Sequence, residues 1–237
     1  MPNASFVFKQ FKVEQDKCAM KVNTDAVLLG AWVIPNGSTN ILDIGTGTGV
    51  IALMLAQKSN AQILAIDIDK HATEQAHLNV KSSIFKNIIV QHISFQELSE
   101  TTAYKFDLIV TNPPYFIDSL KSQDENRKIA RHNQNLSFTD ILSGAKKLLT
   151  ENGKLCLILP TKEASIFREE AKEKGLYLSK LLRIKTRADN SNEKRHIMLF
   201  EFKQTEFSEA TLIIEGEKAG TYSEAYKMLT RDYYINF

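Results

Sequence analysis

Residues 41–49, Ile-Leu-Asp-Ile-Gly-Thr-Gly-Thr-Gly, set the fold class expected for this chain. Residues 41–44 form an apolar run typical of a strand buried on both faces of a parallel sheet. The glycines that follow allow a tight turn and a close approach of the backbone to a ligand. Residues 50–58 have the composition of a helix, whose first N–H groups lack partners within the helix. Strand, turn and helix together predict a nucleotide-like ligand at Asp43, Gly45, Thr46, Gly47 and Gly49.

The spacing of these glycines separates two classes of nucleotide site. A dinucleotide-binding turn has the pattern G-x-G-x-x-G, but Val50 stands where its third glycine would be. Asp67 ends the next apolar run, and a carboxylate there can accept hydrogen bonds from ribose hydroxyls. The glycine turn and Asp67 together resemble motif I and the acidic strand end of S-adenosylmethionine-dependent methyltransferases. An NAD site and a tight turn without a ligand are the alternatives.

The regions around this turn alternate between short β-branched runs and helix-like stretches, which predicts a mostly parallel sheet with helices on both faces. Asp69 is expected to cap a helix over 70–82, and Ser137 with Asp140 a helix over 137–149. The predicted fold class is therefore α/β and Rossmann-like. Its strands are expected at 40–44, 62–66, 88–92, 106–111 and 154–159.

The last third of the chain has a different pattern. Strand-like runs at 180–186 and 194–202 are separated by a connection too short for a parallel crossover, so we expect an antiparallel hairpin. A final helix is expected over 222–231, with Thr221 and Glu224 as its capping pair.

Composition excludes several classes of protein. The chain has 237 residues, of which 43% are hydrophobic and 24% charged, with a formal net charge of +2. This balance is ordinary for a globular protein and unlike that of collagen, a coiled coil or a disordered chain. No apolar run approaches the ~18 residues of a membrane span, and the N-terminus lacks the regions of a secretory signal. We expect a cytoplasmic protein that does not contact membranes.

The sequence also predicts one domain without metal. Cys18 and Cys156 are too few for a disulfide framework and wrongly spaced for zinc, so we expect buried, reduced thiols. No Pro/Gly/Ser-rich linker divides the chain. We therefore expect residues 1–237 to form a single domain, with 1–36 as an N-terminal covering segment and 37–237 as the core.

A second functional signal follows the predicted strand 106–111, which runs directly into Asn112-Pro113-Pro114-Tyr115. In doubly wound sheets, ligands bind at the carboxyl ends of strands. Prolines restrict the backbone and lack N–H groups, so carbonyl oxygens of this turn and the Asn112 side-chain oxygen can accept hydrogen bonds. Two such acceptors orient an exocyclic amino group and increase electron density on its nitrogen. Tyr115 offers an aromatic face to a planar base, and we predict that all four residues are catalytic.

The motif and the opening of the chain carry a family resemblance. Asn-Pro-Pro-Tyr resembles motif IV of amino methyltransferases, which act on adenine N6, on glutamine amide nitrogen or on related amines. The segment from Phe8 to Trp32 resembles the opening of the bacterial tRNA(Val) adenine-N6 methyltransferase family, and the likeness continues through Arg127 and Ala130-Arg131-His132. It implies a class I fold, S-adenosylmethionine as cofactor, and the adenine 3′ of the anticodon in the tRNA anticodon loop as the site of methylation.

The resemblance also implies roles for residues outside the two motifs. The opening segment would lie over the cofactor, with Lys21, Thr24 and Asp25 near its methionine end. A carboxylate near the end of the third strand often contacts the adenine of the cofactor in related enzymes. Residues 91–95 contain no Asp, and Ser94 is expected to take that place.

Basic side chains in two regions are expected to contact RNA phosphates. Segment 116–134 is long and polar, and loops of that length are uncommon without a function. The alternatives are a charged surface loop and, for 180–195, a solvated hairpin edge where Lys and Arg discourage strand pairing. The predicted substrate-binding residues are Lys121, Arg127, Lys128, Arg131, His132, Arg187 and Arg195.

Three other functions stay open at this point. A release-factor glutamine methyltransferase usually carries a separate N-terminal helical domain, for which the residues before Asp43 leave little room. The substrate can also be another RNA or a small-molecule amine. A cofactor-binding module without catalysis is an alternative of a different class, against which the intact Asn-Pro-Pro-Tyr argues. The sequence does not determine the oligomeric state, and a monomer is compatible with it.

Overall fold

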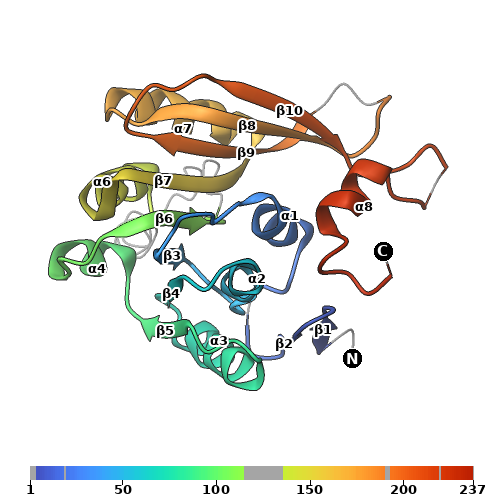
Figure 1. Ribbon diagram of the computed structural model, residues 1–237, viewed down its shortest axis with the longest axis horizontal. Helices are drawn as coiled ribbons and strands as arrows, with labels where there is room; N and C mark the ends of the chain where they lie inside the picture. The colour runs from blue at the N-terminus through green and yellow to red at the C-terminus, as the bar shows by residue number, and fades with distance from the viewer. Residues whose placement is uncertain (1–3, 19, 115–135, 190–192, 219, 237) are drawn as a thin grey trace, which may run out of the picture.

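An eight-stranded, mostly parallel sheet is the centre of the protein, with strand order β10-β8-β9-β7-β6-β3-β4-β5 (Figure 1). The computed structural model describes residues 4–18, 20–114, 136–189, 193–218 and 220–236. The strands are β3 (Asn40–Ile44), β4 (Gln62–Asp67), β5 (Ile88–His92), β6 (Phe106–Thr111), β7 (Leu149–Pro160), β8 (Tyr177–Lys185), β9 (Glu193–Glu201) and β10 (Ser208–Ile213). A separate two-stranded sheet pairs β1 (Ser5–Val7) with β2 (Lys12–Glu14).

Helices cover both faces of the large sheet, as the alternating sequence pattern predicts. In Figure 1, α4 and α6 lie to the left of the strands and α1 and α2 to the right. One buried cluster joins the sheet to α1, α2 and α8, and a second joins it to α4, α6 and α7. The helices are α1 (Thr24–Trp32), α2 (Val50–Lys58), α3 (Lys70–Ser82), α4 (Phe95–Thr101), α6 (Phe138–Leu148), α7 (Thr161–Glu173) and α8 (Glu224–Thr230).

The order of strands reverses at β3: the chain adds β4 and β5 on one side of β3 and then β6 and β7 on the other. This reversal brings the two sequence motifs together. β3 lies between β4 and β6, and all three run parallel. Ile44, the last residue of β3, is the register partner of Thr111, the last residue of β6, and the Thr111 hydroxyl donates to the Ile44 carbonyl at 3.0 Å. The glycine turn after β3 and Asn112 after β6 therefore follow the carboxyl ends of two neighbouring strands, so they lie at the same end of the sheet.

Local capping signals place most of the helix starts. Ser137 and Asp140 form the expected capping box of α6, and the Asp69 side chain caps α3. The expectation for the last helix is wrong: Ser223 rather than Thr221 caps α8, accepting from the Tyr226 N–H at 3.1 Å. A capping hydroxyl accepts from the N–H three positions further along, and Ser223 is the residue directly before the observed helix.

The C-terminal hairpin is confirmed, but its edge is not exposed. β8 and β9 pair antiparallel, and β10 adds in parallel on the other side of β8. The interpretation of 180–195 as a solvated hairpin edge is therefore wrong for β8. Arg183 of β8 instead forms ion pairs with Glu193 at 3.1 Å and Glu209 at 2.9 Å, joining the three strands.

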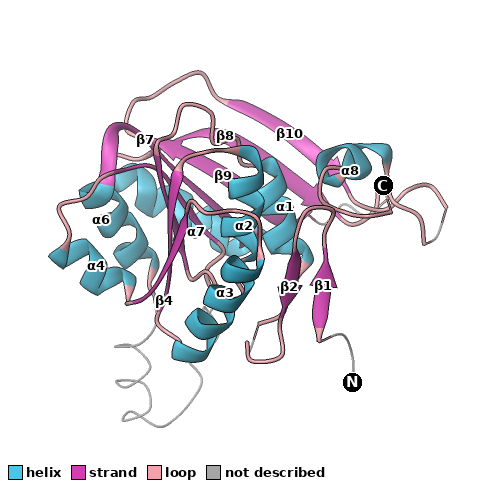
Figure 2. Cartoon of the chain, turned by 60° about the horizontal axis from the view of Figure 1, so that its bottom comes forward, coloured by secondary structure: helices cyan, strands magenta, loops and turns pink. Residues whose placement is uncertain are grey.

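The N-terminal sheet packs beside α3 (Figure 2). Phe8 and Phe11, in the connection between β1 and β2, are buried and stack with ring centroids 4.6 Å apart. Cys18 and Cys156 are both buried free thiols, as expected. In the described ranges, no helix has the length and apolar character needed to cross a membrane.

Candidate active site

A cavity of about 440 Å³ opens at the carboxyl ends of β3, β4, β5 and β6. This volume lies within the range of small-molecule sites, ~300–1,000 Å³. Its walls combine both sequence motifs: the glycine turn and Asp67 on one side, Asn112 and Pro114 on the other. Of the predicted site residues, it is lined by Gly45, Gly47, Asp67, Ser94, Asn112 and Pro114. We refer to it as the cofactor cavity.

The glycine turn forms one wall of the cofactor cavity. Gly45 has a φ of +68°, in the region that glycine favours, and a Cβ built on it would meet no atom within 4 Å. Its missing side chain therefore leaves space for a ligand against the backbone. Gly49 has a φ of +82° and begins α2, and a Cβ there would lie 3.3 Å from Ala76 of α3. Gly49 thus allows close packing of two helices behind the cavity.

Asp67 connects the end of β4 to the glycine turn. One carboxylate oxygen accepts from the Gly47 N–H and the other from the Asp69 N–H, both at 2.9 Å. Burial raises the pKa of Asp67, and these two hydrogen bonds oppose the shift. Each carboxylate oxygen can accept more than one hydrogen bond, so Asp67 retains capacity toward the cavity that it lines. This arrangement fits the two ribose hydroxyls of a nucleoside.

Asp43 occupies a different place from the one that its motif suggests. It is fully buried and accepts from the Thr46 hydroxyl at 2.6 Å, so both residues support the turn from within the protein. Its Oδ1 has no hydrogen-bond partner among the described residues. Burial raises the pKa of Asp43 to about 7, the Thr46 hydrogen bond opposes this, and the charge of Asp67 adds to it. Asp43 and Thr46 therefore shape the turn.

Ser94 lies where the resemblance implies an adenine contact. It lines the cofactor cavity, and its hydroxyl oxygen accepts from the Glu97 N–H at 3.1 Å as the cap of α4. A hydroxyl that accepts one hydrogen bond still has its own proton to donate. Ser94 can thus cap a helix and donate to a ring nitrogen.

Residues of the N-terminal segment line the cofactor cavity, and a buried side chain of α3 binds the main chain of that segment. Cys18 and Met20 line the cavity from this segment. Gln75 of α3, which is buried, accepts from the Lys17 N–H at 3.1 Å. Buried Gln15 accepts from the Val22 N–H at 2.9 Å, which links two described positions of this segment. Cys18 and Met20 were missed as lining residues, although the resemblance places their segment over the cofactor.

A second hollow of about 360 Å³ adjoins the cofactor cavity, and Asn112 lines both. Thr24 and Asp25, which the resemblance places near the cofactor, line this second hollow instead. Lys21, which follows Met20 in the sequence, is exposed. The second hollow, which we call the amine hollow, is lined by Met20, Asn23, Thr24, Asp25, Asn112, Pro113 and Arg195.

The two described residues of the predicted phosphate-binding set lie in different surroundings. Arg195 lines the amine hollow and pairs with Asp25 at 2.7 Å, joining β9 to the start of α1. Arg187 is exposed beyond the end of β8 and pairs with Asp189 at 3.2 Å. Arg195 is therefore next to the site, whereas Arg187 lies in the turn region of the hairpin.

The remaining predicted residues belong to the segment after Pro114. They lie outside the described residues. They are Tyr115, Lys121, Arg127, Lys128, Arg131 and His132.

Two kinds of comparison show which known proteins this chain resembles in sequence. The profile of the methyltransferase small domain family matches residues 18–167. A protein of Phocaeicola vulgatus is 44% identical over 237 residues, covering 100% of both chains. Relatives from Bacteroides fragilis (42% identical, 99% of both chains) and Pseudoalteromonas translucida (41% identical, 98% of this chain and 99% of the relative) are similar over the same length. All three are named tRNA1(Val) (adenine(37)-N6)-methyltransferase.

Solved structures show the same fold. A predicted O-methyltransferase from Agrobacterium tumefaciens superposes with a TM-score of 0.65 at 17% identity, covering 88% of this chain and 96% of the other. A ribosomal protein L11 methylase from Lactobacillus delbrueckii subsp. bulgaricus has a TM-score of 0.60 at 16% identity, covering 81% of this chain and 84% of the other. The Rossmann-like fold expected from the sequence is confirmed.

Proposed function

This chain belongs to the methyltransferase small domain family and, within it, to the tRNA1(Val) (adenine(37)-N6)-methyltransferases, and from this we propose what it does. It transfers a methyl group from S-adenosylmethionine to the N6 amino group of an adenine in tRNA. We take this adenine to be position 37 of tRNA1(Val), in the anticodon loop, and the name that the relatives carry supports this choice. The enzyme class and the cofactor follow from the family.

One observation carries the proposal at the level of the site: Asn112 lines both the cofactor cavity and the amine hollow. S-adenosylmethionine, when bound, supplies an electrophilic methyl group on its sulfonium. The residues of the cofactor cavity hold it by the ribose and leave the amine hollow to the substrate. A base amino group bound in the hollow beside Asn112 then lies next to the donor.

Asn112 and Pro113 have the chemistry to orient that amino group. The Asn112 Oδ1 and the Pro113 carbonyl are acceptors, and the N6 amino group of adenine has two N–H donors. Accepting both hydrogen bonds holds the nitrogen in place and increases its electron density, so catalysis is largely positioning and electrostatics. After transfer the amine carries a positive charge and loses its proton to water.

Pro114 and Tyr115 complete the motif in this proposal. Pro114 lines the cofactor cavity, and its ring keeps the turn after β6 in one conformation. The aromatic ring of Tyr115 stacks on the target base once that base has left the helical stack. Removing a base from its stack costs a few kcal/mol, least in a single-stranded loop. This favours an anticodon loop over a duplex.

The test is the pair Asn112→Ala and Asn112→Asp, assayed on tRNA with S-adenosylmethionine. Loss of the acceptor in Asn112→Ala should lower kcat by ~100-fold or more, as for other removed transition-state hydrogen bonds, with cofactor affinity by calorimetry nearly unchanged. Asn112→Asp keeps an acceptor oxygen at the same position and should retain more activity than the alanine variant. Turnover of Asn112→Ala within about twofold of the wild type would contradict the assignment.

The substrate is tested separately from the mechanism. Mass spectrometry of tRNA nucleosides from cells with and without the gene should show N6-methyladenosine lost from tRNA1(Val) alone. The purified enzyme should restore it in vitro, and a release-factor peptide containing glutamine should stay unmodified. Methylation of the peptide but not of tRNA would replace the proposed substrate with a protein.

A further inference from the structure

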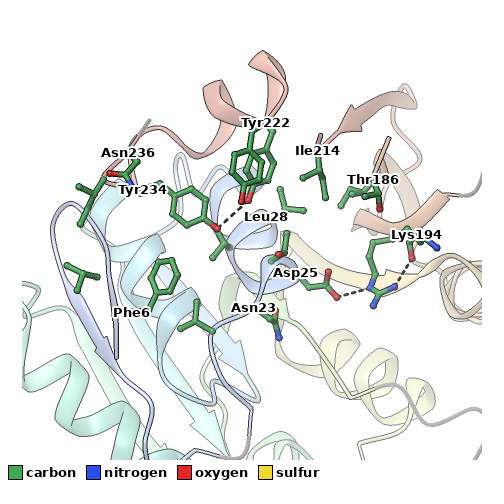
Figure 3. Close-up of a pocket in the computed structure, with 18 residues that line it drawn as sticks. Phe6, Asn23, Asp25, Leu28, Thr186, Lys194, Ile214, Tyr222, Tyr234 and Asn236 are labelled. Atoms are coloured by element: carbon green, nitrogen blue, oxygen red, sulfur yellow. Dashed lines mark hydrogen bonds and ion pairs between the residues drawn. The ribbon is translucent and has the colours of Figure 1, made fainter. Parts of the chain in front are cut away.

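A third and larger cavity, of about 800 Å³, continues from the amine hollow (Figure 3). The two share the residues at the start of α1 together with Arg195 of β9: Asn23, Thr24, Asp25 and Arg195. The walls of the larger cavity come from β1, α1, the ends of β8 and β9, and the C-terminal residues around α8. Nothing in the proposed reaction uses this space, which we call the tyrosine cavity.

Aromatic rings form one wall of the tyrosine cavity. Tyr222 is 45% exposed and stacks on buried Tyr226, with ring centroids 4.9 Å apart and ring planes at 19°. The Tyr226 and Tyr234 hydroxyls lie 3.3 Å apart, and Tyr234 stacks in turn on buried Phe8. The partly exposed ring of Tyr222 therefore rests on a stack of further aromatic rings, and Figure 3 shows Tyr222 and Tyr234 on the same side of the space.

Cationic side chains form the opposite wall. Lys194 is exposed at the start of β9, and Arg195 beside it is held by Asp25 at 2.7 Å. In Figure 3, Asp25 and Lys194 lie across the cavity from Tyr222 and Tyr234. The cavity thus presents an aromatic face, positive charge and a carboxylate, which match a base, a phosphate and a base amino or imino group respectively.

Single-stranded nucleic acid is recognised by this combination of stacking rings and cations. A helix of a partner protein in an apolar groove would not need the cations, and the cavity is continuous with the place of the target adenine. Resting on the proposed function, we infer that the tyrosine cavity binds the nucleotide next to the target adenine in the RNA. Its base stacks on Tyr222, and its phosphate lies against Lys194.

The kinetic test compares Tyr222→Ala, Tyr222→Phe and Met228→Ala. Met228 is 66% exposed on α8 and is not among the residues that line the cavity, so its variant is the control. Stacking of one base is worth ~1–3 kcal/mol, so Tyr222→Ala should raise KM for tRNA by roughly 5–150-fold. Its kcat and S-adenosylmethionine affinity should stay near wild type, and Tyr222→Phe should behave as wild type. An unchanged KM in Tyr222→Ala would overturn the inference.

A cross-linking experiment tests the same contact without relying on activity. An anticodon stem-loop carries 5-iodouridine at the position on either side of the target adenine, and irradiated complexes are digested and mapped by mass spectrometry. We expect a cross-link to the peptide that contains Tyr222, and its loss in Tyr222→Ala. Cross-links confined to other parts of the chain would overturn the inference.

The outcomes separate this inference from the proposed function. A wild-type enzyme that methylates no tRNA refutes the function itself. A wild-type enzyme that methylates tRNA with the same KM as Tyr222→Ala leaves the function standing and removes only the tyrosine cavity from it.

The salt dependence of RNA binding tests the contact between Lys194 and a phosphate. Lys194→Ala should lower the slope of log affinity against log salt concentration by about 1, the change expected for one lost phosphate contact.

Discussion

Asn79 of α3 binds the main chain of Glu14 in β2 as a neighbouring strand would. Its Oδ1 accepts from the Glu14 N–H at 2.9 Å, and its Nδ2 donates to the Glu14 carbonyl at 2.8 Å and to the Thr48 carbonyl at 2.9 Å. One buried carboxamide thus ties the N-terminal sheet to the glycine turn. Figure 2 shows β2 beside α3, where this contact lies.

Asn79→Ala should therefore reduce both stability and cofactor affinity. The substitution leaves main-chain groups of Glu14 and Thr48 without their hydrogen-bond partner. Each such group costs ~1–3 kcal/mol unless water replaces the lost partner. We therefore expect the free energy of unfolding to fall by roughly 2–4 kcal/mol. The covering segment should also detach more easily, raising the Kd for S-adenosylmethionine. His77→Ala, on the exposed side of α3, is the control. Equal urea midpoints for Asn79→Ala and wild type would contradict the prediction.

Asp67→Asn should weaken cofactor binding. The carboxylate accepts from two backbone N–H groups, Gly47 and Asp69, and an amide would direct its NH₂ toward one of them. We expect Kd for S-adenosylmethionine to rise ~10-fold or more, a loss of about 1.4 kcal/mol, and Asp67→Ala to lose at least as much. Glu74→Gln, exposed on α3, should bind as wild type. An unchanged calorimetric Kd in both Asp67 variants would rule out a ribose contact.

Asp43 should make stability depend on pH. Burial raises its pKa to about 7 in the folded protein from an ordinary value of 3.8. Between these values the folded state binds more protons than the unfolded state, so the contribution of Asp43 to the free energy of unfolding falls as pH rises from 4 to 7. Asp43→Asn keeps an acceptor for Thr46 and removes the titration.

The measurement is urea unfolding of wild type and Asp43→Asn from pH 4.5 to 8. Each pKa unit corresponds to about 1.4 kcal/mol, so the stability of the variant relative to wild type should increase by roughly 2–4 kcal/mol across this range. A difference between the two proteins that is the same at pH 5 and pH 8 would show that Asp43 ionises normally.

Asp25 and Arg195 should affect the RNA and leave the cofactor unaffected. Both line the amine hollow, and their ion pair is 2.7 Å long with side chains 20% and 31% exposed. We expect Asp25→Ala to raise KM for tRNA because Arg195 loses its position, with Kd for S-adenosylmethionine unchanged. A higher Kd for the cofactor would instead support the contact near the methionine end that the sequence resemblance implies.

The coupling between these two residues can be measured directly. A double-mutant cycle with Asp25→Ala and Arg195→Ala should give a coupling energy of about 1 kcal/mol or less in unfolding, because the pair is partly exposed to solvent. Coupling in KM for tRNA should be larger than coupling in stability. Strict additivity in KM would show that the two side chains act independently.

Several features were predictable because their causes lie close together in the sequence. α2 and α3 have the bounds that the pattern predicts, and Ser137 with Asp140 forms the expected capping box. A capping bond, a glycine turn or a buried run depends on residues within a few positions of one another. The placement of Asn112 at a strand end followed from the same kind of signal.

Other features depend on contacts between distant segments. β10 beside β8, Ser223 as the cap of α8 and the place of Asp43 beneath the turn were not predicted. The sequence motif groups Asp43 with Gly45 and Gly47, which line the cofactor cavity, whereas Asp43 itself is buried and accepts from the Thr46 hydroxyl. In the same way, Asp25 forms an ion pair with Arg195, which is 170 residues further along the chain.

The amino-acid sequence by itself was enough to establish the parallel α/β sheet, the glycine turn with Asp67 and the methyltransferase motif after β6. These depend on local periodicity and on side chains next to one another in the chain. The folded chain alone settled that Asn112 lines two adjoining cavities and that Tyr222, Lys194 and Asp25 surround a third. Strand order and helix packing bring these residues together, and no local pattern encodes which distant segments meet.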